Sequence, residues 1–587
     1  MKKLLALLLG LLTSPAWAQT GVSAPELAPC DAAVQKFMKR WDIPGASVAI
    51  ARHGKLVYAR GFGHANLART EPMTPAHLLR VASVSKPVTA VAVMKLVEQG
   101  RLDLRHTVFG PGGYLNQPYY SDVITDRRIY AITVQQLLEH SAGWNRNAGV
   151  DGFSSSDPID FPLHVAQAMH VPNPVGDSTL VRYLLSKGLN FTPGTRFAYS
   201  NIGYLVLGKI IEQVTGQRYE TWVRRHVLEP SGVLEAHLGR NLRADKVERE
   251  AEYFCDATNK SCYGTGKRVP FAYGGANLEA MNAHGGWLFT ARDLVRLLLA
   301  VDGLPTRPDI LQPATLDTMT TPSEASRRYA KGWMVNRRGM WWHTGCLNGS
   351  ASCVVRTADG YTWAILLNSF PMNANRFWDD LEDLGWACVG GVDAWPTHDL
   401  FAPEHNAAQL QVTASSAAAT TLAWARGSGS HSLLVVREDK PVDAFAQDGQ
   451  AYTASRTFGL GDVLGKGNVV VAAGADSTVQ IRGLRPGHTY HARVMEYSAN
   501  EATGQQPVYT LEGNPVVRFR VPEAAPVAKA KARRPSKAVA GKLRAKKPTA
   551  PAAAQPAAPS GQASRTPRAT QTSYLLRLRS VLSGPKG

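Results

Sequence analysis

The pattern of hydrophobic and polar residues mixes helix and strand signals up to about Val389. Two short apolar runs separated by a polar turn predict a β-hairpin over 45–63. Apolar residues spaced three and four apart predict an amphipathic helix over 83–100, and a shorter run of the same kind predicts another helix over 132–140. Residues 144–180 are rich in Gly, Asn, Asp, Pro and Ser, which indicates a long surface insertion of the kind that often borders a binding cleft.

The pattern changes in the second part of the chain. Residues 409–522 contain only short alternating runs separated by turn residues, which is typical of an all-β sandwich. Within them, Leu484-x-Pro486-Gly487-x-x-Tyr490 resembles the tyrosine corner of fibronectin type III domains, in which the phenol hydroxyl bonds to the backbone of the preceding turn. Residues 523–587 are mostly Ala, Pro, Lys and Arg, and we expect this tail to be disordered because it cannot bury enough apolar surface to fold.

The positive charge of the chain is concentrated in this tail. The 587 residues carry a formal net charge of +19, which at first suggests nucleic-acid binding. The tail holds 14 basic residues and one acid, so the rest of the chain carries only +6. We therefore expect no nucleic-acid partner, and we expect the tail to bind anionic polymers of a cell envelope.

The N-terminal residues predict export. Lys2 and Lys3 precede an apolar run that ends near Ala16-Trp17-Ala18, the pattern of a secretory signal peptide over residues 1–18. This run is too short to span a bilayer, and no later apolar run approaches 18 residues, so we expect no transmembrane helix after cleavage. The predicted location is the periplasm or the extracellular space.

The six cysteines fit an oxidising compartment, where disulfides form. Their spacing leaves 15 sets of pairings open. The plausible pairs, none of them settled by the spacing, are Cys255–Cys262, Cys346–Cys353 and Cys30–Cys388. The sequence contains no CxxC or HExxH motif, so we expect no metal and no cofactor.

Three short motifs carry candidate chemistry: Ser83-x-x-Lys86, Tyr199-Ser200-Asn201 and His343-Thr344-Gly345. Each is weak alone, and the chain holds a further match to each, namely Ser583-x-x-Lys586, Tyr114-x-Asn116 and His284-x-Gly286. Ser83 opens the predicted helix, and residues i and i+3 share a helix face, so Lys86 can reach its hydroxyl. An amine there can activate a serine nucleophile, and the helix N-terminus favours developing negative charge.

The wider sequence around these motifs resembles one family. The matching segments, in chain order, are RVASVSKP (80–87), LLEHSAG (137–143), FAYSNIGY (197–204), GGWLFTARDL (285–294) and HTG (343–345). This ordered set is similar to the serine β-lactamase-related family, which includes class C β-lactamases, DD-peptidases, D-aminopeptidases and esterases. The resemblance covers residues 26–398. It implies an α/β (α+β) fold of the β-lactamase/transpeptidase type, with an antiparallel sheet, flanking helices and a helical region.

The resemblance also implies the catalytic roles. Ser83 looks like the acylated nucleophile, and Lys86 and Tyr199 look like its base system, with Tyr199 returning a proton to the leaving group. Which of the two takes the serine proton stays open. A tyrosine with a pKa near 10 is a poor base at neutral pH, so Lys86 would have to lower the pKa of Tyr199.

Substrate binding is implied for the remaining motif residues. Asn201 would orient Lys86 and bind the substrate amide, and the backbone N–H groups of Ser83 and Cys346 would form the oxyanion hole. His343-Thr344-Gly345 would lie on a strand at the cleft edge and pair with an extended substrate. Most class C β-lactamases have Lys at the position of His343. A histidine is mostly neutral at pH 7 and binds a carboxylate less firmly, which argues against efficient β-lactamase turnover. For Cys346, a disulfide with Cys353 is favoured over a reactive thiol.

These observations predict an exported serine hydrolase that forms an acyl-enzyme. Its expected substrates are small peptides or amides, such as D-Ala-type cell-wall peptides. The alternatives within the enzyme class are a β-lactamase acting on β-lactams and a carboxylesterase acting on esters. The alternative from another class is an envelope-binding protein with a degenerate catalytic domain.

Overall fold

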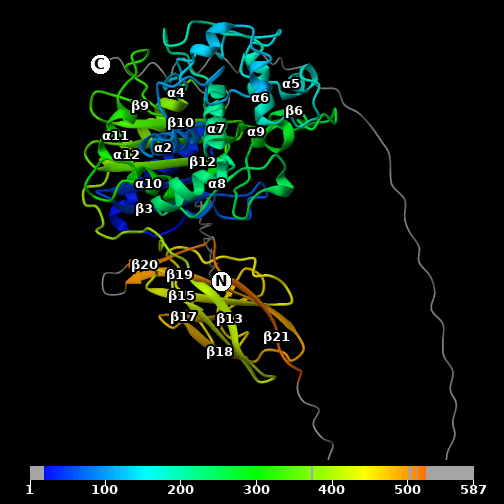
Figure 1. The fold of residues 1–587 in the computed structure, drawn as a ribbon. Coiled ribbons are helices and arrows are strands. Elements are labelled where there is room, and N and C mark those ends of the chain that lie inside the picture. The colour runs from blue at the N-terminus through cyan, green and yellow to red at the C-terminus, as the bar shows by residue number, and fades with distance from the viewer. Residues whose placement is uncertain (1–18, 372–374, 501–504, 512, 524–587) are drawn as a thin grey trace, which may run out of the picture.

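The computed structural model describes a mixed α/β region followed by an all-β region (Figure 1). This arrangement confirms the predicted fold class. The described residues are 19–371, 375–500, 505–511 and 513–523. The predicted signal peptide over 1–18 and the predicted tail, apart from Glu523, lie outside them.

A seven-stranded antiparallel sheet forms the centre of the first region. The predicted hairpin is its β2–β3 pair, in which Arg52 lies opposite Lys55. The two turn residues between them, His53 and Gly54, have positive φ, as a tight two-residue hairpin turn requires. In order across the sheet the strands are β1 (Gln19–Thr20), β3 (Lys55–Gly63), β2 (Gly45–Arg52), β12 (Tyr361–Leu367), β11 (Ser350–Arg356), β10 (Trp341–Leu347) and β9 (Met334–Val335).

The two faces of this sheet pack against different helices. On β2, Val48 and Ile50 belong to a hydrophobic cluster with one helix pair, whereas Ala49 and Ala51 belong to the cluster with the other pair. Because both faces are covered, β2 and β12 are almost continuously apolar. The helices on the first face are α1 (Ala28–Trp41) and α12 (Phe377–Gly390), and those on the second are α2 (Ser85–Glu98) and α10 (Ala291–Leu299).

Helix α2 lies in the middle of the helical region and is surrounded by other helices. The predicted helix is present. The prediction that it is amphipathic is wrong, because residues 85–94 and Leu96 are all buried and most of the helix has no exposed polar side. The second predicted helix is α4 (Val134–Leu138), whose N-terminus is closed by a Thr133–Gln136 capping box. The other helices are α3 (Pro118–Ser121), α5 (Pro162–Ala168), α6 (Asp177–Leu185), α7 (Asn201–Thr215), α8 (Tyr219–Val223), α9 (Leu278–Gly285) and α11 (Pro313–Thr320).

Smaller strands complete the first region. One three-stranded sheet has the order β4 (Leu79–Arg80), β8 (Trp287–Phe289) and β5 (Ala236–Leu238), and β6 (Thr258–Lys260) pairs with β7 (Arg268–Pro270).

The prediction of a surface insertion over 144–180 is wrong in part. The segment contains α5 and the beginning of α6, and residues 155–159 are buried.

The all-β region consists of two sheets that face each other across a hydrophobic core. Tyr490 is fully buried in this core, and its hydroxyl accepts a hydrogen bond from the backbone N–H of Arg485 at 2.8 Å. This is the bond that the tyrosine-corner motif predicts, while membership of the fibronectin type III class stays a prediction. The strands are β13 (Ala408–Ser415), β14 (Ala419–Ala425) and β18 (Thr478–Arg482) in one sheet, and β16 (Val463–Leu464), β17 (Asn468–Gly474), β15 (His431–Glu438), β19 (Thr489–Asn500), β20 (Gln505–Tyr509) and β21 (Val516–Arg520) in the other.

The two regions meet at a buried group of charges. Arg292 of α10 forms an ion pair with Asp448 of the sandwich, and it lies 3.8 Å from Glu235. Glu235 accepts a hydrogen bond from the backbone N–H of Leu511 at 3.0 Å and pairs with Arg249 at 3.2 Å. Side chains from both regions therefore share one ionic network.

One of the three plausible disulfides is present. Cys30 of α1 is bonded to Cys388 of α12, while the other four cysteines have free thiols. The preference for a Cys346–Cys353 bond is wrong because of the strand register. Cys346 lies opposite Ala351 and Cys353 opposite Thr344, so the two cysteines are diagonal neighbours, too far apart for a disulfide.

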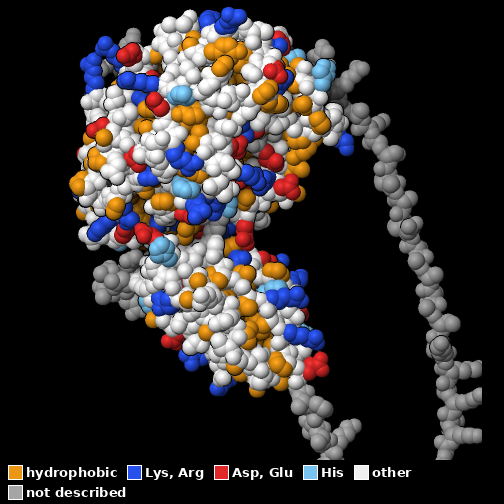
Figure 2. All heavy atoms as spheres, in the orientation of Figure 1, with side chains coloured by type: hydrophobic (Ala, Val, Ile, Leu, Met, Phe, Trp, Pro, Cys, Tyr) orange, Lys and Arg blue, Asp and Glu red, His pale blue; other side chains and the backbone are white. Residues whose placement is uncertain are grey.

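Charged side chains of both signs are interspersed over the visible face of the two regions (Figure 2). This agrees with the small net charge of the chain outside the tail. Among the described residues, no helix has the length and apolar character needed to cross a membrane.

Candidate active site

Ser83 lies in a tight 3-10 turn over Ala82–Val84 that leads directly into α2. The preceding residue, Ala82, has a φ of +48°, a left-handed conformation that is unfavourable for any residue with a Cβ. Ala82 is 1% exposed, so the packed surroundings hold it in this conformation. Backbone strain of this kind is concentrated at functional sites, and here it places the serine at the N-terminus of a buried helix.

Strand β10 runs against this turn. A Cβ on Gly345 would come within 2.1 Å of the Val81 carbonyl oxygen and 3.1 Å of the Ser83 nitrogen, so only glycine allows the approach. Strand β9 pairs only with Trp341 and Trp342, so the part of β10 from His343 onward lies at the edge of the sheet, beside Ser83. Cys346 follows Gly345 on this edge. Its burial raises the pKa of the thiol to about 12, so it is not a reactive thiolate.

Lys86 lies one turn after Ser83, as the i, i+3 spacing predicts. Its Nζ is 3.0 Å from Ser83 Oγ, 2.8 Å from Asn201 Oδ1 and 2.9 Å from the carbonyl oxygen of His284. The last contact exists because His284 is near the C-terminus of α9, where backbone carbonyls have no partner within the helix. Asn201 is the first residue of α7, and Ser200 caps that helix by accepting from the backbone N–H of Gly203.

These three contacts determine how a neutral Lys86 would be oriented. The Asn201 and His284 oxygens can only accept, so each takes one N–H from the amine. A neutral amine has two N–H bonds and one free electron pair, and that pair is then left to face Ser83 Oγ. The geometry therefore allows the hydroxyl of Ser83 to donate its proton toward Lys86.

The electrostatic surroundings favour the neutral amine. Burial lowers the pKa of Lys86 well below its usual value, and the Arg146 guanidinium lowers it further, while Asp157 opposes them. Burial raises the pKa of Tyr199 above its usual value, although Ser83 and Arg146 partly offset the rise. The expectation that Lys86 lowers the pKa of Tyr199 is therefore not met. The Tyr199 ring lies beside the amine, with its centroid 4.9 Å from Lys86 Nζ.

His343 is 2% exposed, and both of its ring nitrogens have partners. Nδ1 lies 2.7 Å from the Thr344 carbonyl oxygen, so it carries the proton, and Nε2 accepts from the Tyr329 hydroxyl at 3.3 Å. The Tyr329 oxygen in turn accepts from His140 Nε2 at 3.2 Å. Burial, with a smaller contribution from Lys86, lowers the pKa of His343 to about 3, so His343 is neutral at physiological pH.

The structure brings Ser83, Lys86, Tyr199, Asn201 and the His343-Thr344-Gly345 strand together, and it adds residues that the motifs did not indicate. Asp157 of the 144–180 segment accepts from Asn201 Nδ2 at 2.7 Å. His284 belongs to one of the extra motif matches, yet its backbone carbonyl is part of the site. His140 stands in the LLEHSAG segment, but Tyr329 has no signal in the sequence.

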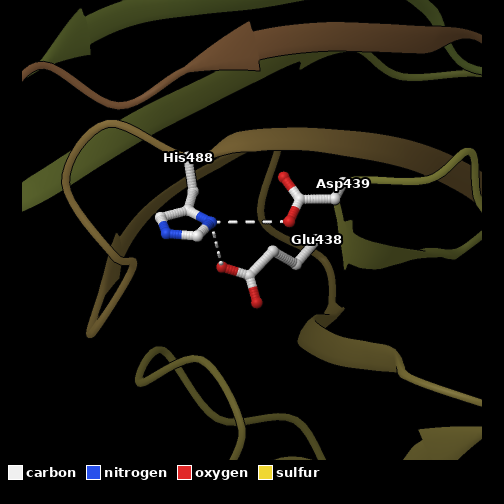
Figure 3. Close-up of side chains that lie close together, drawn as sticks. All are labelled: Glu438, Asp439 and His488. Carbon is white, nitrogen blue, oxygen red and sulfur yellow. Dashed lines mark hydrogen bonds and ion pairs between the residues drawn. The ribbon is translucent and has the colours of Figure 1, made fainter. Parts of the chain in front are cut away.

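A separate group of polar side chains lies on the sandwich (Figure 3). His488 Nδ1 is 3.3 Å from Glu438 Oε1 and 3.4 Å from Asp439 Oδ2, a donor set that resembles a metal site. Both oxygens of Glu438, however, already pair with the Arg485 guanidinium, and Oε1 also accepts from the Tyr490 hydroxyl at 2.8 Å. We therefore assign this group to the tyrosine corner rather than to metal binding.

Comparison with known proteins decides the family. The family model described as Beta-lactamase matches residues 30–384, more than half of the chain. The chain belongs to the β-lactamase family. This is a family of serine hydrolases, and the match covers every residue of the candidate active site around Ser83.

Two curated relatives of this β-lactamase family member have low sequence identity to it. Protein flp of Staphylococcus aureus (strain MW2) is 28% identical over 200 residues, which cover 34% of this chain and 36% of Protein flp. The chain thus spans about a third of the length of that relative. Esterase EstB of Burkholderia gladioli is 29% identical over 342 residues, which cover 55% of this chain and 79% of the esterase.

The matches to solved structures are weaker. A D-amino acid amidase from Ochrobactrum anthropi SV3, complexed with L-phenylalanine, has a TM-score of 0.49 at 21% identity, over 62% of this chain and 98% of that one. The octameric penicillin-binding protein homologue from Pyrococcus abyssi has a TM-score of 0.46 at 20% identity, over 82% of this chain and 100% of that one.

Proposed function

We propose that this chain is a serine hydrolase that cleaves ester and amide bonds through an acyl-enzyme on Ser83. The observation that carries the proposal is the position of Lys86 Nζ, 3.0 Å from Ser83 Oγ, with both N–H bonds of its neutral form taken by carbonyl oxygens. An amine so placed is a general base for a serine nucleophile.

In the first half-reaction, Ser83 Oγ forms a bond to the substrate carbonyl carbon while its proton passes to Lys86. Negative charge develops on the carbonyl oxygen, where the backbone N–H groups of Ser83 and Cys346 and the N-terminus of α2 would stabilise it. The bond to the leaving group then breaks, and the leaving group takes a proton returned through Tyr199. In the second half-reaction, water gives a proton to the same base while its oxygen bonds to the acyl carbon. The bond from that carbon to Ser83 Oγ then breaks, and Ser83 Oγ takes the proton back from the base.

The finer substrate proposal is an amide of the D-Ala cell-wall type. A carboxylesterase is the second candidate, and two observations favour it. His343 is buried and neutral, so it supplies no cation for the carboxylate that ends a D-Ala peptide or accompanies a β-lactam. Esterase EstB also matches over most of its own length.

Three substrates compared under identical conditions test the proposal. We expect hydrolysis of a short-chain nitrophenyl ester or a D-Ala-D-Ala peptide, and slow turnover of a chromogenic cephalosporin. Mass spectrometry of the quenched reaction should detect an acyl group on the peptide containing Ser83. Ser83→Ala should abolish both hydrolysis and the adduct, and an adduct that persists in this variant would refute the mechanism.

We also propose that the protein is exported and that its basic tail tethers it to anionic envelope polymers. The +13 charge of residues 523–587 supports this, and such attraction weakens as salt rises. Deletion of the tail should release the protein from envelope fractions while leaving Ser83 labelling intact. A wild-type protein that no β-lactam or fluorophosphonate acylates would instead favour an envelope-binding protein with a degenerate site.

A further inference from the structure

Asp157 lies beside the candidate active site, although its segment carries no recognised motif. The residue is 3% exposed, and its Oδ2 accepts from Asn201 Nδ2 at 2.7 Å. Hydrogen bonds from the surrounding loop hold it in place. The Asp157 backbone N–H donates to Ser155 Oγ at 3.0 Å, and the Ser156 backbone N–H donates to the Arg146 carbonyl oxygen at 2.9 Å.

The chemistry of a carboxylate determines how the Asn201 amide is oriented. A carboxylate can only accept, so Asn201 must turn its NH2 group toward Asp157 and its Oδ1 toward Lys86. If the amide were reversed, its NH2 group would face the amine and compete with Ser83 for the free electron pair. The orientation seen, with Oδ1 2.8 Å from Lys86 Nζ, leaves that pair to the serine.

We propose that Asp157 is a positioning residue for nucleophile activation: by holding the Asn201 amide in one orientation, it directs the electron pair of Lys86 at Ser83. This inference rests on the proposed serine hydrolase function. It assigns to the 144–180 segment a part in the chemistry, in addition to bordering the cleft.

Asp157 also places a negative charge near the amine, and Arg146 of the same segment places a positive one. Burial, with a smaller contribution from Asp160, raises the pKa of Asp157 to about 6, so at neutral pH it is a carboxylate. Asp157 raises the pKa values of both Lys86 and Tyr199, and Arg146 lowers both. Further ionisable groups near the amine or the carboxylate include His140, His284, His343, Tyr204 and Asp160.

Substitutions of Asp157 and Arg146 therefore have opposite expected effects on the pH profile. Acylation requires the deprotonated base, so its rate rises with pH along an acid limb set by the pKa of that base. Asp157→Asn removes the negative charge and should move the limb to lower pH, whereas Arg146→Gln should move it to higher pH. The signs are the same whether Lys86 or Tyr199 takes the serine proton.

The experiment measures the rate of Ser83 labelling by a fluorophosphonate probe between pH 5 and 10 in the full-length protein. Asp157→Asn should slow labelling roughly 10–100-fold, because its NH2 group allows Asn201 to reverse. Asp160→Asn is the matched control. Its carboxylate accepts from Ser155 Oγ at 2.6 Å and is exposed, so labelling at pH 7–8 should stay within about twofold of wild type.

The inference is overturned if Asp157→Asn keeps the wild-type rate and profile, or if its acid limb moves in the same direction as that of Arg146→Gln. If Asp157→Asn does not fold, Asp157→Glu carries the test, since it keeps both the charge and a group that only accepts. The acid limb of the pH–rate profile of Asp157→Glu should lie at the same pH as in the wild type. A shifted limb would refute the positioning role of Asp157. Ser83→Ala in the same assay tests the proposed function by itself. If the probe still labels this variant, the proposed function has failed, whatever the result for Asp157.

Discussion

Two buried groups of ionisable residues in this protein differ in the charge of the partners that contact their central cation or amine. At the junction of the two regions, Arg292 directly faces the carboxylates of Asp448 and Glu235. In the candidate active site, Lys86 directly contacts a hydroxyl and two carbonyl oxygens, none of them charged. Burial lowers the pKa of both groups, but the acidic partners of Arg292 outweigh this and raise its pKa, whereas the pKa of Lys86 stays well below its usual value.

The comparison separates a structural charge from a reactive one. A buried charge with opposite charges in contact stays ionised and serves packing. A buried amine that is surrounded by dipoles loses its proton and becomes a base. Under the proposed function, the junction contributes to stability and the Lys86 group to chemistry, so substitutions in the two groups should affect stability and activity separately.

The largest expected effect follows removal of the amine. Lys86→Met should reduce hydrolysis and Ser83 labelling by roughly 10²–10⁴-fold, the usual contribution of a general base. The free energy of unfolding should change much less, because the amine pairs with no charge in contact. Active-site titration and a urea unfolding curve check the two parts, and a large loss of stability with labelling retained would contradict the comparison.

Removal of the Arg292 cation at the junction should reduce stability and leave the chemistry of Ser83 intact. Arg292→Met leaves Asp448 and Glu235 without their shared partner and should cost about 3–5 kcal/mol of unfolding free energy. Ser83 labelling at low temperature should remain. Arg307→Met is the matched control: it removes a partner of Asp399 whose side chain is 27% exposed, and it should cost about 0–1 kcal/mol. Equal losses in the two variants would show that burial of the Arg292 pair is unimportant.

The stability of the fold should depend on pH through buried groups at both sites. The pKa of His343 is about 3 in the folded protein and about 6.5 in an unfolded chain. Between these values the unfolded chain binds more protons, so the free energy of unfolding falls as the pH falls from 6.5 toward 3. Asp293 near the junction has its pKa raised to about 6 and acts in the opposite direction, stabilising the fold as the pH falls.

His343→Asn should remove the contribution of this histidine, worth about 2 kcal/mol between pH 6.5 and pH 5. Melting temperatures of the two proteins measured over this range test the sign. Parallel curves would mean that the pKa of His343 is the same in the folded protein as in the unfolded chain.

The smallest expected effect concerns the hydroxyl between the two histidines. Tyr329→Phe leaves His343 Nε2 and His140 Nε2 without that partner, which should cost about 1 kcal/mol of stability. Labelling of Ser83 should change little, since Tyr329 does not contact Lys86 or Ser83. A much larger loss of labelling than of stability would place Tyr329 among the residues that activate the nucleophile.

Local sequence patterns predicted a substantial part of this structure. The period of the helix places Lys86 beside Ser83, and a polar turn between apolar runs predicts the β2–β3 hairpin. The Leu484–Tyr490 motif predicts a hydroxyl–backbone bond within six residues. Each of these features depends on residues close together in the chain, where backbone geometry alone decides which groups meet.

Features that join distant segments were predicted poorly. The Cys346–Cys353 pairing is wrong because the register of β10 and β11 is set by a tight turn that the spacing did not show. Helix α2 is buried on all sides because α7, α8 and α9 pack around it, which its own pattern did not indicate. The role of Asp157 was missed because 44 residues separate it from Asn201.

The motifs around Ser83, Tyr199 and His343 occur together and in order, so the amino-acid sequence alone is enough to name the candidate reactive groups. Their hydrogen-bond partners and the direction of their pKa shifts became apparent only in the folded structure. Burial lowers the pKa of Lys86, and the carbonyl of His284 and the amide oxygen of Asn201 accept hydrogen bonds from its amine. The Tyr329 hydroxyl hydrogen-bonds to Nε2 of His343. Protonation and hydrogen-bond direction depend on burial and on the positions of all neighbouring dipoles, and these exist only once the chain has folded.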